Sequence, residues 1–463
     1  MKISRRSFLK AAAAIGASLA WVGPARGSRV HWHERRDLYP QGVASGDPDP
    51  HSVILWTRRP FAQGTRQLLT VEVAEDEAFR RVIAHAQAPV SSAADWTARV
   101  LIGGLKPART YWYRFTDTDG NGSRVGRTIT APLPNDPRTV NFAFVSCQDV
   151  NEGKLNAYRR MIYEDERAPA AQQLDFVLHL GDFIYEVVEY PDEVKTRYDR
   201  TIYEVARIPD GGQVGKFHFP LTVDGYRAIY KGYLADPDLQ DARARWPFVA
   251  IWDNHEFSWQ GWQSIQKAGK ARPGQSIKVA ANQAWWEYLP SRCKKFSGPS
   301  LESFDPPAVT NVAIEKWDEN GLGDEPNNLA AINSLIAYRS YRYGKHLDLI
   351  ITDQHSYRSA DRSATRRPEL SGRTSRACFR RTWRRFSTAA VRSTAGIRRR
   401  KSASMARMFP IRSATHRRRR SSAPSRKPGS KTSSAIQPRR GKSGAIQKAH
   451  PTRAPTRKIC RRV

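Results

Sequence analysis

The chain has 463 residues, four cysteines and a formal net charge of +33, which allows two domains and would suit a nucleic-acid-binding protein. The charge is concentrated at one end: residues 361–463 hold 32 Lys and Arg against 2 Asp and Glu, a balance of +30. The first 360 residues are therefore nearly neutral, which argues against nucleic-acid binding by the body of the protein.

The amino terminus has the pattern of an export signal. The paired arginines Arg5 and Arg6 are followed by Phe-Leu-Lys and then by an apolar stretch at 11–22. That stretch is too short to span a bilayer stably, and small residues suited to cleavage follow it. We expect residues 1–27 to be a twin-arginine signal, read by the twin-arginine export machinery, that yields a periplasmic or secreted protein without a stable membrane span. The alternative is a chance Arg-Arg pair in an ordinary secretory signal.

Residues 38–137 have the alternating pattern of antiparallel strands. Apolar and polar side chains alternate in segments such as 69–73, and turn residues separate these segments. The sequence around Tyr111 resembles the tyrosine corner of fibronectin-type sandwiches. We predict an all-β sandwich of the fibronectin or immunoglobulin type.

From residue 140 to about 360 the pattern changes to strand, helix, strand, which predicts an α/β fold. Continuous apolar runs at 142–145, 176–178 and 248–251 indicate buried parallel strands. The predicted helices are 154–166, 223–234 and 280–288, and two more strands are predicted near 335–341 and 347–352. Residues 298–328, rich in Pro, Asn, Asp and Gly, predict a long surface loop.

Each of the three apolar runs ends in residues that can bind metal: FVSCQD at 144–149, HLGDFIYE at 179–186 and WDNHEF at 252–257. Because ligands bind at the carboxyl ends of parallel strands, these three segments can converge on one crevice. The carboxylate of Asp182 can bridge two cations. His255 can serve as a nitrogen ligand or as a proton donor, and we assign it a catalytic role.

The donor types in these segments suggest two kinds of metal ion. A thiolate and a phenolate suit ferric iron, whereas carboxylate and amide oxygens suit calcium or another hard divalent ion. Cations held close together would clamp a phosphoryl group and lower the pKa of a bound water, and Arg358 could hold the phosphate oxygens. A disulfide between Cys147 and Cys293 is the alternative use of the first thiol.

Six motifs in order resemble the PhoD-type alkaline phosphatases. They are the twin-arginine signal, GVASGDPDPHSVILWTR at 42–58, the three metal-binding segments and TDQHSYR at 352–358. The resemblance covers roughly residues 1–360. It implies a fibronectin-like amino-terminal domain and a calcineurin-like metallophosphoesterase domain over 140–360. It also implies hydrolysis of phosphate monoesters and diesters outside the cytoplasm, with Fe3+ and Ca2+ or another divalent metal as cofactors.

The resemblance also implies roles for individual residues. Cys147, Asp182 and Tyr185 match iron ligands, and Asn254 matches a calcium-site position. Asp353 and Arg358 match substrate-binding positions, within a motif that commonly reads Asp-Thr-Arg-Gln-Tyr-Arg and here reads Asp-Gln-His-Ser-Tyr-Arg. We expect small phosphate esters as substrates, no specific nucleic acid and a monomeric protein.

Residues 361–463 depart from the family pattern. The family completes its metal cluster with Asp and His residues from a later Gly-Asp-x-His segment, and no such segment follows Asp361. Arg, Ala, Ser, Pro and Thr dominate instead, as expected of GC-rich codons read in a shifted frame. We therefore expect a frameshift product and an incomplete, inactive enzyme. The alternative is a genuine basic tail on a non-enzymatic exported scaffold that binds nucleic acid or anionic lipid.

Overall fold

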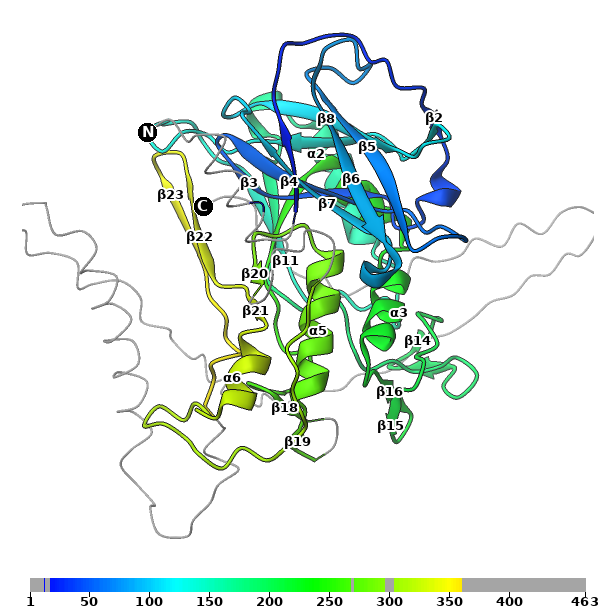
Figure 1. Ribbon diagram of the computed structural model, residues 1–463, viewed down its shortest axis with the longest axis vertical. Coiled ribbons are helices and arrows are strands. Elements are labelled where there is room, and N and C mark those ends of the chain that lie inside the picture. Colours follow the sequence, from blue (N-terminus) through cyan, green and yellow to red (C-terminus); the bar gives the residue numbers. More distant parts are fainter. Residues whose placement is uncertain (1–11, 13–16, 268–269, 296–303, 360–463) are drawn as a thin grey trace, which may run out of the picture. The chain divides into compact units, whose positions relative to one another are not determined.

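The computed structural model of the chain describes residue 12 and residues 17–267, 270–295 and 304–359 (Figure 1). All of these belong to the first of two units into which the chain divides. The predicted frameshift segment, 361–463, lies outside the described residues. Among the described helices, none is both long enough and apolar enough to cross a membrane.

Three parallel strands carry the polar motifs at their ends. β11 (Phe142–Val145) pairs with β12 (Phe176–His179), which pairs in turn with β17 (Pro247–Ala250). β12 and β17 are buried along their whole length, whereas β11 at the edge of the sheet is partly buried. The prediction of adjacent parallel strands from these apolar runs is confirmed.

The same sheet continues into the amino-terminal region. β17 pairs in parallel with β3 (Val43–Asp49), and β4 (Ser52–Arg58), β7 (Thr97–Gly103) and β1 (Ser18–Trp21) extend the sheet in that order. One mixed sheet thus contains strands from both sides of the predicted boundary between 137 and 140, because Ser45 and Gly46 of β3 lie beside β17. The predicted division into 38–137 and 140–360 stays a prediction.

A second sheet packs on the amino-terminal part of the first. Its strands, in spatial order, are β2 (His33–Glu34), β9 (Asn121–Gly122), β8 (Thr110–Thr116), β5 (Arg66–Ala74) and β6 (Val82–Ser91), and β10 (Gly126–Ile129) also pairs with β8. Side chains from both sheets share one apolar core. The backbone N–H of Lys106 donates to the Tyr111 hydroxyl at 2.9 Å, the hydrogen bond that a tyrosine corner requires.

The three predicted helices are present as α2 (Asn156–Arg167), α3 (Val223–Tyr233) and α5 (Gln275–Tyr288). Two further helices, α4 (Pro237–Arg245) and α6 (Pro326–Ile332), were not predicted, and α6 begins within the predicted loop 298–328. The apolar stripe of α3 is buried, as predicted for a core helix. The sequence analysis missed α4, although Asp236 followed by Pro237 is a start signal: the Asp236 carboxylate accepts the N–H groups of Asp238 and Leu239.

The remaining strands form short antiparallel pairs outside the two sheets. They are β13 (Thr196–Arg197) with β14 (Arg200–Thr201), β15 (Gly212–Val214) with β16 (Phe217–Phe219), β18 (Ile265–Gln266) with β19 (Arg272–Pro273), β20 (Lys294–Lys295) with β21 (Leu335–Ile336), and β22 (Arg339–Tyr343) with β23 (Leu347–Ile351). β22 and β23 form the long hairpin in Figure 1. Ile350 on this hairpin is 72% exposed, although its apolar run is typical of a buried strand.

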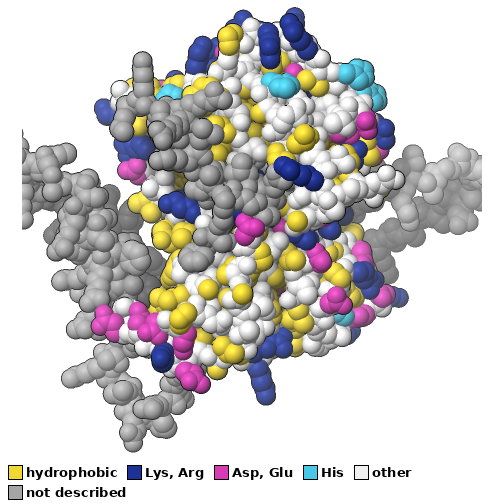
Figure 2. Space-filling model, in the orientation of Figure 1, with side chains coloured by type: hydrophobic (Ala, Val, Ile, Leu, Met, Phe, Trp, Pro, Cys, Tyr) yellow, Lys and Arg dark blue, Asp and Glu magenta, His cyan; other side chains and the backbone are white. Residues whose placement is uncertain are grey.

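The described surface carries both signs of charge. Figure 2 shows Lys and Arg side chains interspersed with Asp and Glu over one face. Arg159, for example, pairs with Asp238 and Asp241, and Arg207 pairs with Asp192. This face therefore has the mixed charge expected from the near-neutral composition of the first 360 residues.

The carboxyl end of α5 is buried, and side chains from the amino-terminal strands satisfy its free carbonyl groups. The Arg99 guanidinium donates to the carbonyls of Trp286, Leu289 and Ser291 at 2.6 to 2.7 Å. Trp56 Nε1 donates to the Glu287 carbonyl at 2.7 Å, and Arg243 of α4 donates to the Tyr288 carbonyl at 3.0 Å. The last carbonyls of a helix have no partner within it, so these bonds fix α5 to the shared sheet.

Replacing Arg99 should therefore destabilise the fold strongly. Arg99→Leu would leave the buried carbonyls of Trp286 and Ser291 without the Arg99 donor, at about 1–3 kcal/mol each, while the Leu289 carbonyl keeps the N–H of Ser291. We therefore expect the free energy of unfolding to fall by roughly 2 kcal/mol or more. Urea unfolding followed by circular dichroism measures this change. The control is Arg80→Leu, whose side chain is 84% exposed and which should change stability by less than about 0.5 kcal/mol. Equal effects of the two substitutions would contradict this account.

Candidate metal centre

Three predicted metal ligands meet at the carboxyl ends of β11 and β12. The Cys147 thiol donates to Asp182 Oδ2 at 3.4 Å, and Cys147 also forms a side-chain hydrogen bond with Tyr185. Asn254 follows β17, and the backbone N–H of its neighbour His255 donates to Asp182 Oδ1 at 3.2 Å. The structure thus brings together a thiol, a carboxylate and a phenol, and it places the Asn254 backbone beside them.

The loops at this site have backbone conformations that side chains rarely adopt. Cys147 and Asp182 have φ values of 54° and 52°, in the left-handed region, where residues other than glycine are strained. At Gly181, which has a φ of 102°, an added Cβ would lie 2.4 Å from the backbone nitrogen of Asp253. Position 181 therefore requires glycine, because the loop after β17 approaches the Gly181 backbone too closely for a side chain.

A buried carboxylate orients His255. Glu186 Oε2 lies 2.6 Å from His255 Nδ1, and Glu186 also accepts the backbone N–H of Trp259. Burial lowers the pKa of His255, but the carboxylates of Glu186 and Asp182 raise it more, so its pKa lies above the ordinary value. Sequence reasoning overlooked Glu186, although it ends the HLGDFIYE segment and is an acidic residue within a largely apolar run.

Burial governs the protonation of the cluster. It raises the pKa of the Cys147 thiol and of the Asp182 carboxyl, and it raises the pKa of the Tyr185 phenol well above its usual value. Within the described residues, no group of three or more His, Cys, Asp and Glu side chains is placed to hold a metal. The phenol of Tyr185 and the amide of Asn254 are the further donors that the predicted ligand set adds to Cys147 and Asp182. A thiolate with a phenolate and a carboxylate is a donor set that fits ferric iron, whose charge would favour their ionised forms.

His355 links the TDQHSYR segment to the loop after β17. Its Nε2 pairs with Asp253 Oδ1, and its Nδ1 lies 3.2 Å from the Gly261 carbonyl oxygen. Asp353 Oδ1 accepts the backbone N–H groups of His355 and Ser356 at 3.0 and 2.9 Å, so this carboxylate closes a turn. Arg358 is exposed, and its substrate contact stays a prediction.

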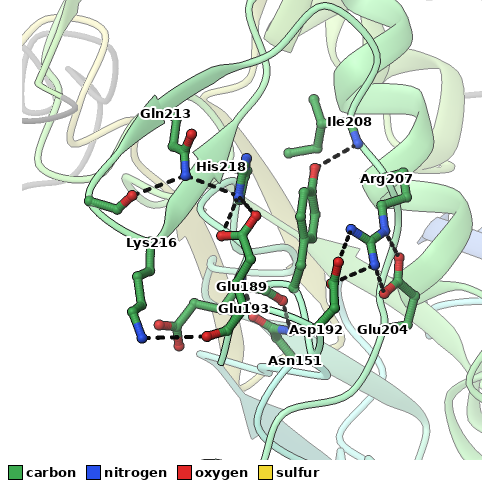
Figure 3. A network of polar contacts seen from close by, with 12 residues as sticks. Asn151, Glu189, Asp192, Glu193, Glu204, Arg207, Ile208, Gln213, Lys216 and His218 are labelled. Atoms are coloured by element: carbon green, nitrogen blue, oxygen red, sulfur yellow. Dashed lines mark hydrogen bonds and ion pairs between the residues drawn. The ribbon is translucent and has the colours of Figure 1, made fainter. Parts of the chain in front are cut away.

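The segment that follows Glu186 is anchored to the Cys147 loop (Figure 3). The Asn151 side chain donates to the Glu189 carbonyl at 2.9 Å and accepts the Glu189 N–H at 2.7 Å. Farther out, His218 Nε2 pairs with Glu193 at 2.9 Å, and Arg207 pairs with Asp192 at 2.7 Å. These contacts hold the chain that follows Tyr185 and Glu186.

The alternative of a disulfide is wrong. Cys147 and Cys293 are not joined by a disulfide. Cys293 is fully buried, with its sulfur 3.8 Å from Arg339 Nη1, and burial raises its pKa to about 11. Of these two described thiols, Cys147 is the half-buried one and lies at the candidate metal centre.

Comparison with known proteins identifies the family. The model of the PhoD-like phosphatase family matches residues 142–392, and that of its N-terminal domain matches residues 25–132. The chain belongs to the PhoD-like phosphatase family. The match of the first model ends at residue 392, beyond residue 360, to which the resemblance seen in the sequence extends.

Two relatives show how much of the family the chain spans. It is 34% identical to alkaline phosphatase D of Bacillus subtilis (strain 168) over 274 residues, which are 57% of this chain and 43% of that protein. A solved structure of PhoD superimposes with a TM-score of 0.52 and 26% identity, covering 69% of this chain and 53% of the other. The chain therefore spans about half the length of the relatives it matches.

The placement of Tyr185 gives an optical test of iron binding. A phenolate bound to ferric iron absorbs visible light by charge transfer, so iron-loaded protein should be purple to blue. Tyr185→Phe should abolish this colour, whereas Tyr198→Phe, at a tyrosine that is 79% exposed, should keep it. Visible absorption with iron content measured on the same samples decides the point. Iron-loaded protein without a visible band would contradict the assignment.

Proposed function

We propose that the chain is an exported, metal-dependent phosphoesterase of the kind that hydrolyses phosphate monoesters and diesters, and that the 463-residue form is inactive because its last metal-ligand segment is missing. The observation that carries this proposal is the cluster of Cys147, Asp182 and Tyr185 beside the Glu186–His255 pair. Membership of the PhoD-like phosphatase family supports the class of reaction.

In this proposal Cys147, Asp182 and Tyr185 hold ferric iron, and Asp182 and Asn254 hold calcium or another divalent ion. Such ions, when bound, polarise phosphoryl oxygens and lower the pKa of a bound water. The described donors support this assignment because the Cys147 thiol contacts both the Asp182 carboxylate and the Tyr185 phenol, and a carboxylate can bridge two cations.

The remaining proposed roles belong to side chains that exchange protons or hold the substrate. Glu186 engages Nδ1 of His255, which leaves Nε2 as the nitrogen that exchanges a proton with the substrate. Arg358, exposed on the segment tied down by His355, would bind phosphate oxygens in two hydrogen bonds. Asp353 would contribute mainly by shaping that turn, since its carboxylate already accepts two backbone N–H groups.

We further propose that the protein is exported through the twin-arginine route and acts as a monomer on small phosphate esters. Residues 1–27 are the proposed signal. β1 lies within this segment and pairs with β7, so cleavage after residue 27 would remove one edge strand of the sheet.

The 463-residue chain is proposed to lack part of its metal site. The described residues provide a thiol, a carboxylate, a phenol and an amide, and residues 361–463 contain no Gly-Asp-x-His segment to add to them. A phosphatase needs each ion fixed by a full set of ligands, because loose coordination misplaces both the nucleophile and the phosphate.

Turnover by two forms of the protein tests this proposal. The 463-residue chain should have negligible activity, whereas a version corrected to the other reading frame near codon 360 should hydrolyse p-nitrophenyl phosphate and bis-p-nitrophenyl phosphate at alkaline pH. Both are assayed with iron and calcium present. Robust turnover by the 463-residue chain would overturn the incomplete site. Absence of turnover by the corrected chain would overturn the phosphoesterase proposal.

A further inference from the structure

Glu256 is a fully buried carboxylate that joins the two loops of the candidate metal centre. Its Oε1 accepts the backbone N–H of Phe183 at 2.6 Å, and its Oε2 accepts those of Asp182 at 3.1 Å and Asp253 at 2.8 Å. The side chain thus bonds to both sides of the Gly181 contact, where the loops after β12 and β17 lie too close for a Cβ.

Burying a carboxylate at this position costs free energy unless its oxygens accept hydrogen bonds. Burial and the nearby Asp182 carboxylate raise the pKa of Glu256 to about 8, and three backbone N–H groups oppose this shift. The ammonium of Lys278, buried on α5 between the rings of Trp252 and Phe257, is the nearby cation that interacts with Glu256. Conversely, the three loop amides would lack a partner without this side chain.

The amides that Glu256 binds belong to residues that set the direction of the metal ligands. Asp182 is itself a proposed ligand, and its Oδ1 also accepts the N–H of His255. Asp253 directly precedes Asn254, the proposed ligand on the other loop. A shift of either backbone would therefore move the Asp182 carboxylate relative to the loop that carries Asn254.

We propose that Glu256 is a positioning residue, which clamps these two loops so that Asp182 and Asn254 face one cation. This inference rests on the proposed metal-dependent function. Glu256 does not touch the cation or the substrate. It acts through the Asp182, Phe183 and Asp253 backbones, and it holds them in place before any ion binds.

Hydrogen exchange in the metal-free 463-residue chain tests the clamp directly. The amides of Asp182, Phe183 and Asp253 lie in loops, yet they should exchange slowly in the wild-type protein. Glu256→Gln replaces one acceptor oxygen with a donor NH2, so at least one of these amides should exchange tenfold or more faster. Rapid exchange of all three amides in the wild-type chain would overturn the proposal, and this measurement needs no variant to fold.

Glu287→Gln is the matched control for a general loss of stability. Glu287 is also a fully buried carboxylate, but it pairs with Arg227 on α3, away from the two loops. This variant should lower overall stability without selectively speeding exchange at residues 182, 183 and 253. Equal acceleration of these amides in both variants would mean that Glu256 supports the fold in general, which contradicts a positioning role.

Titration with Ca2+ alone links the clamp to metal binding. Calorimetry should show at least tenfold weaker binding to Glu256→Gln and also to Glu256→Asp, which keeps the carboxyl group but is too short to reach all three amides. Unchanged Ca2+ affinity in variants whose amides exchange faster would overturn the positioning role. Protected amides in a wild-type chain that binds neither Ca2+ nor iron would instead overturn the proposed metal-dependent function, so the two failures are distinguishable.

Discussion

The candidate site depends on the close approach of two loops that carry buried charge. Gly181 lies against the backbone of Asp253. The Glu256 carboxyl group accepts hydrogen bonds from the backbone N–H groups of Asp182 and Asp253 beside this contact. His255 then follows on the second loop and reaches Asp182 through its N–H and Glu186 through its ring. Because each contact requires the others, the positions of Asp182 and His255 are set by the backbone of both loops together.

This arrangement is supported from the amino-terminal region. Gly46 of β3 lies under the chain that leaves α5, where a Cβ would be 1.9 Å from the Pro290 carbonyl oxygen, and the buried Asp47 carboxylate pairs with Arg339. Arg339 also donates to the carbonyl of Ala250 at the end of β17. The glycine and aspartate of the GVASGDPDP segment therefore hold the strand that leads to Asn254. The amino-terminal strands therefore contribute to the scaffold of the site.

The parts of this structure that could be predicted from sequence have a local signal. Apolar runs predicted β11, β12 and β17 with their parallel pairing, and the residues that follow these strands predicted the meeting of Cys147, Asp182 and Tyr185. The shared sheet could not be predicted, because the pairing of Ser45 with Pro247 joins residues about 200 positions apart without a pattern in either segment. Glu186, Glu256 and His355 were missed for a similar reason. Their partners are backbone groups and side chains on other loops. A single sequence does not distinguish a buried acidic residue or histidine from one that is exposed to solvent.

The most direct test of this account is the X-ray absorption spectrum of iron-loaded protein. If Cys147 and Tyr185 bind the same iron, the spectrum should show one sulfur scatterer together with oxygen scatterers in the first coordination shell. Cys147→Ser should remove the sulfur scatterer and leave the oxygen scatterers in place. A wild-type spectrum with nitrogen and oxygen scatterers alone would contradict the assignment of Cys147, and with it the metal centre from which the function is inferred.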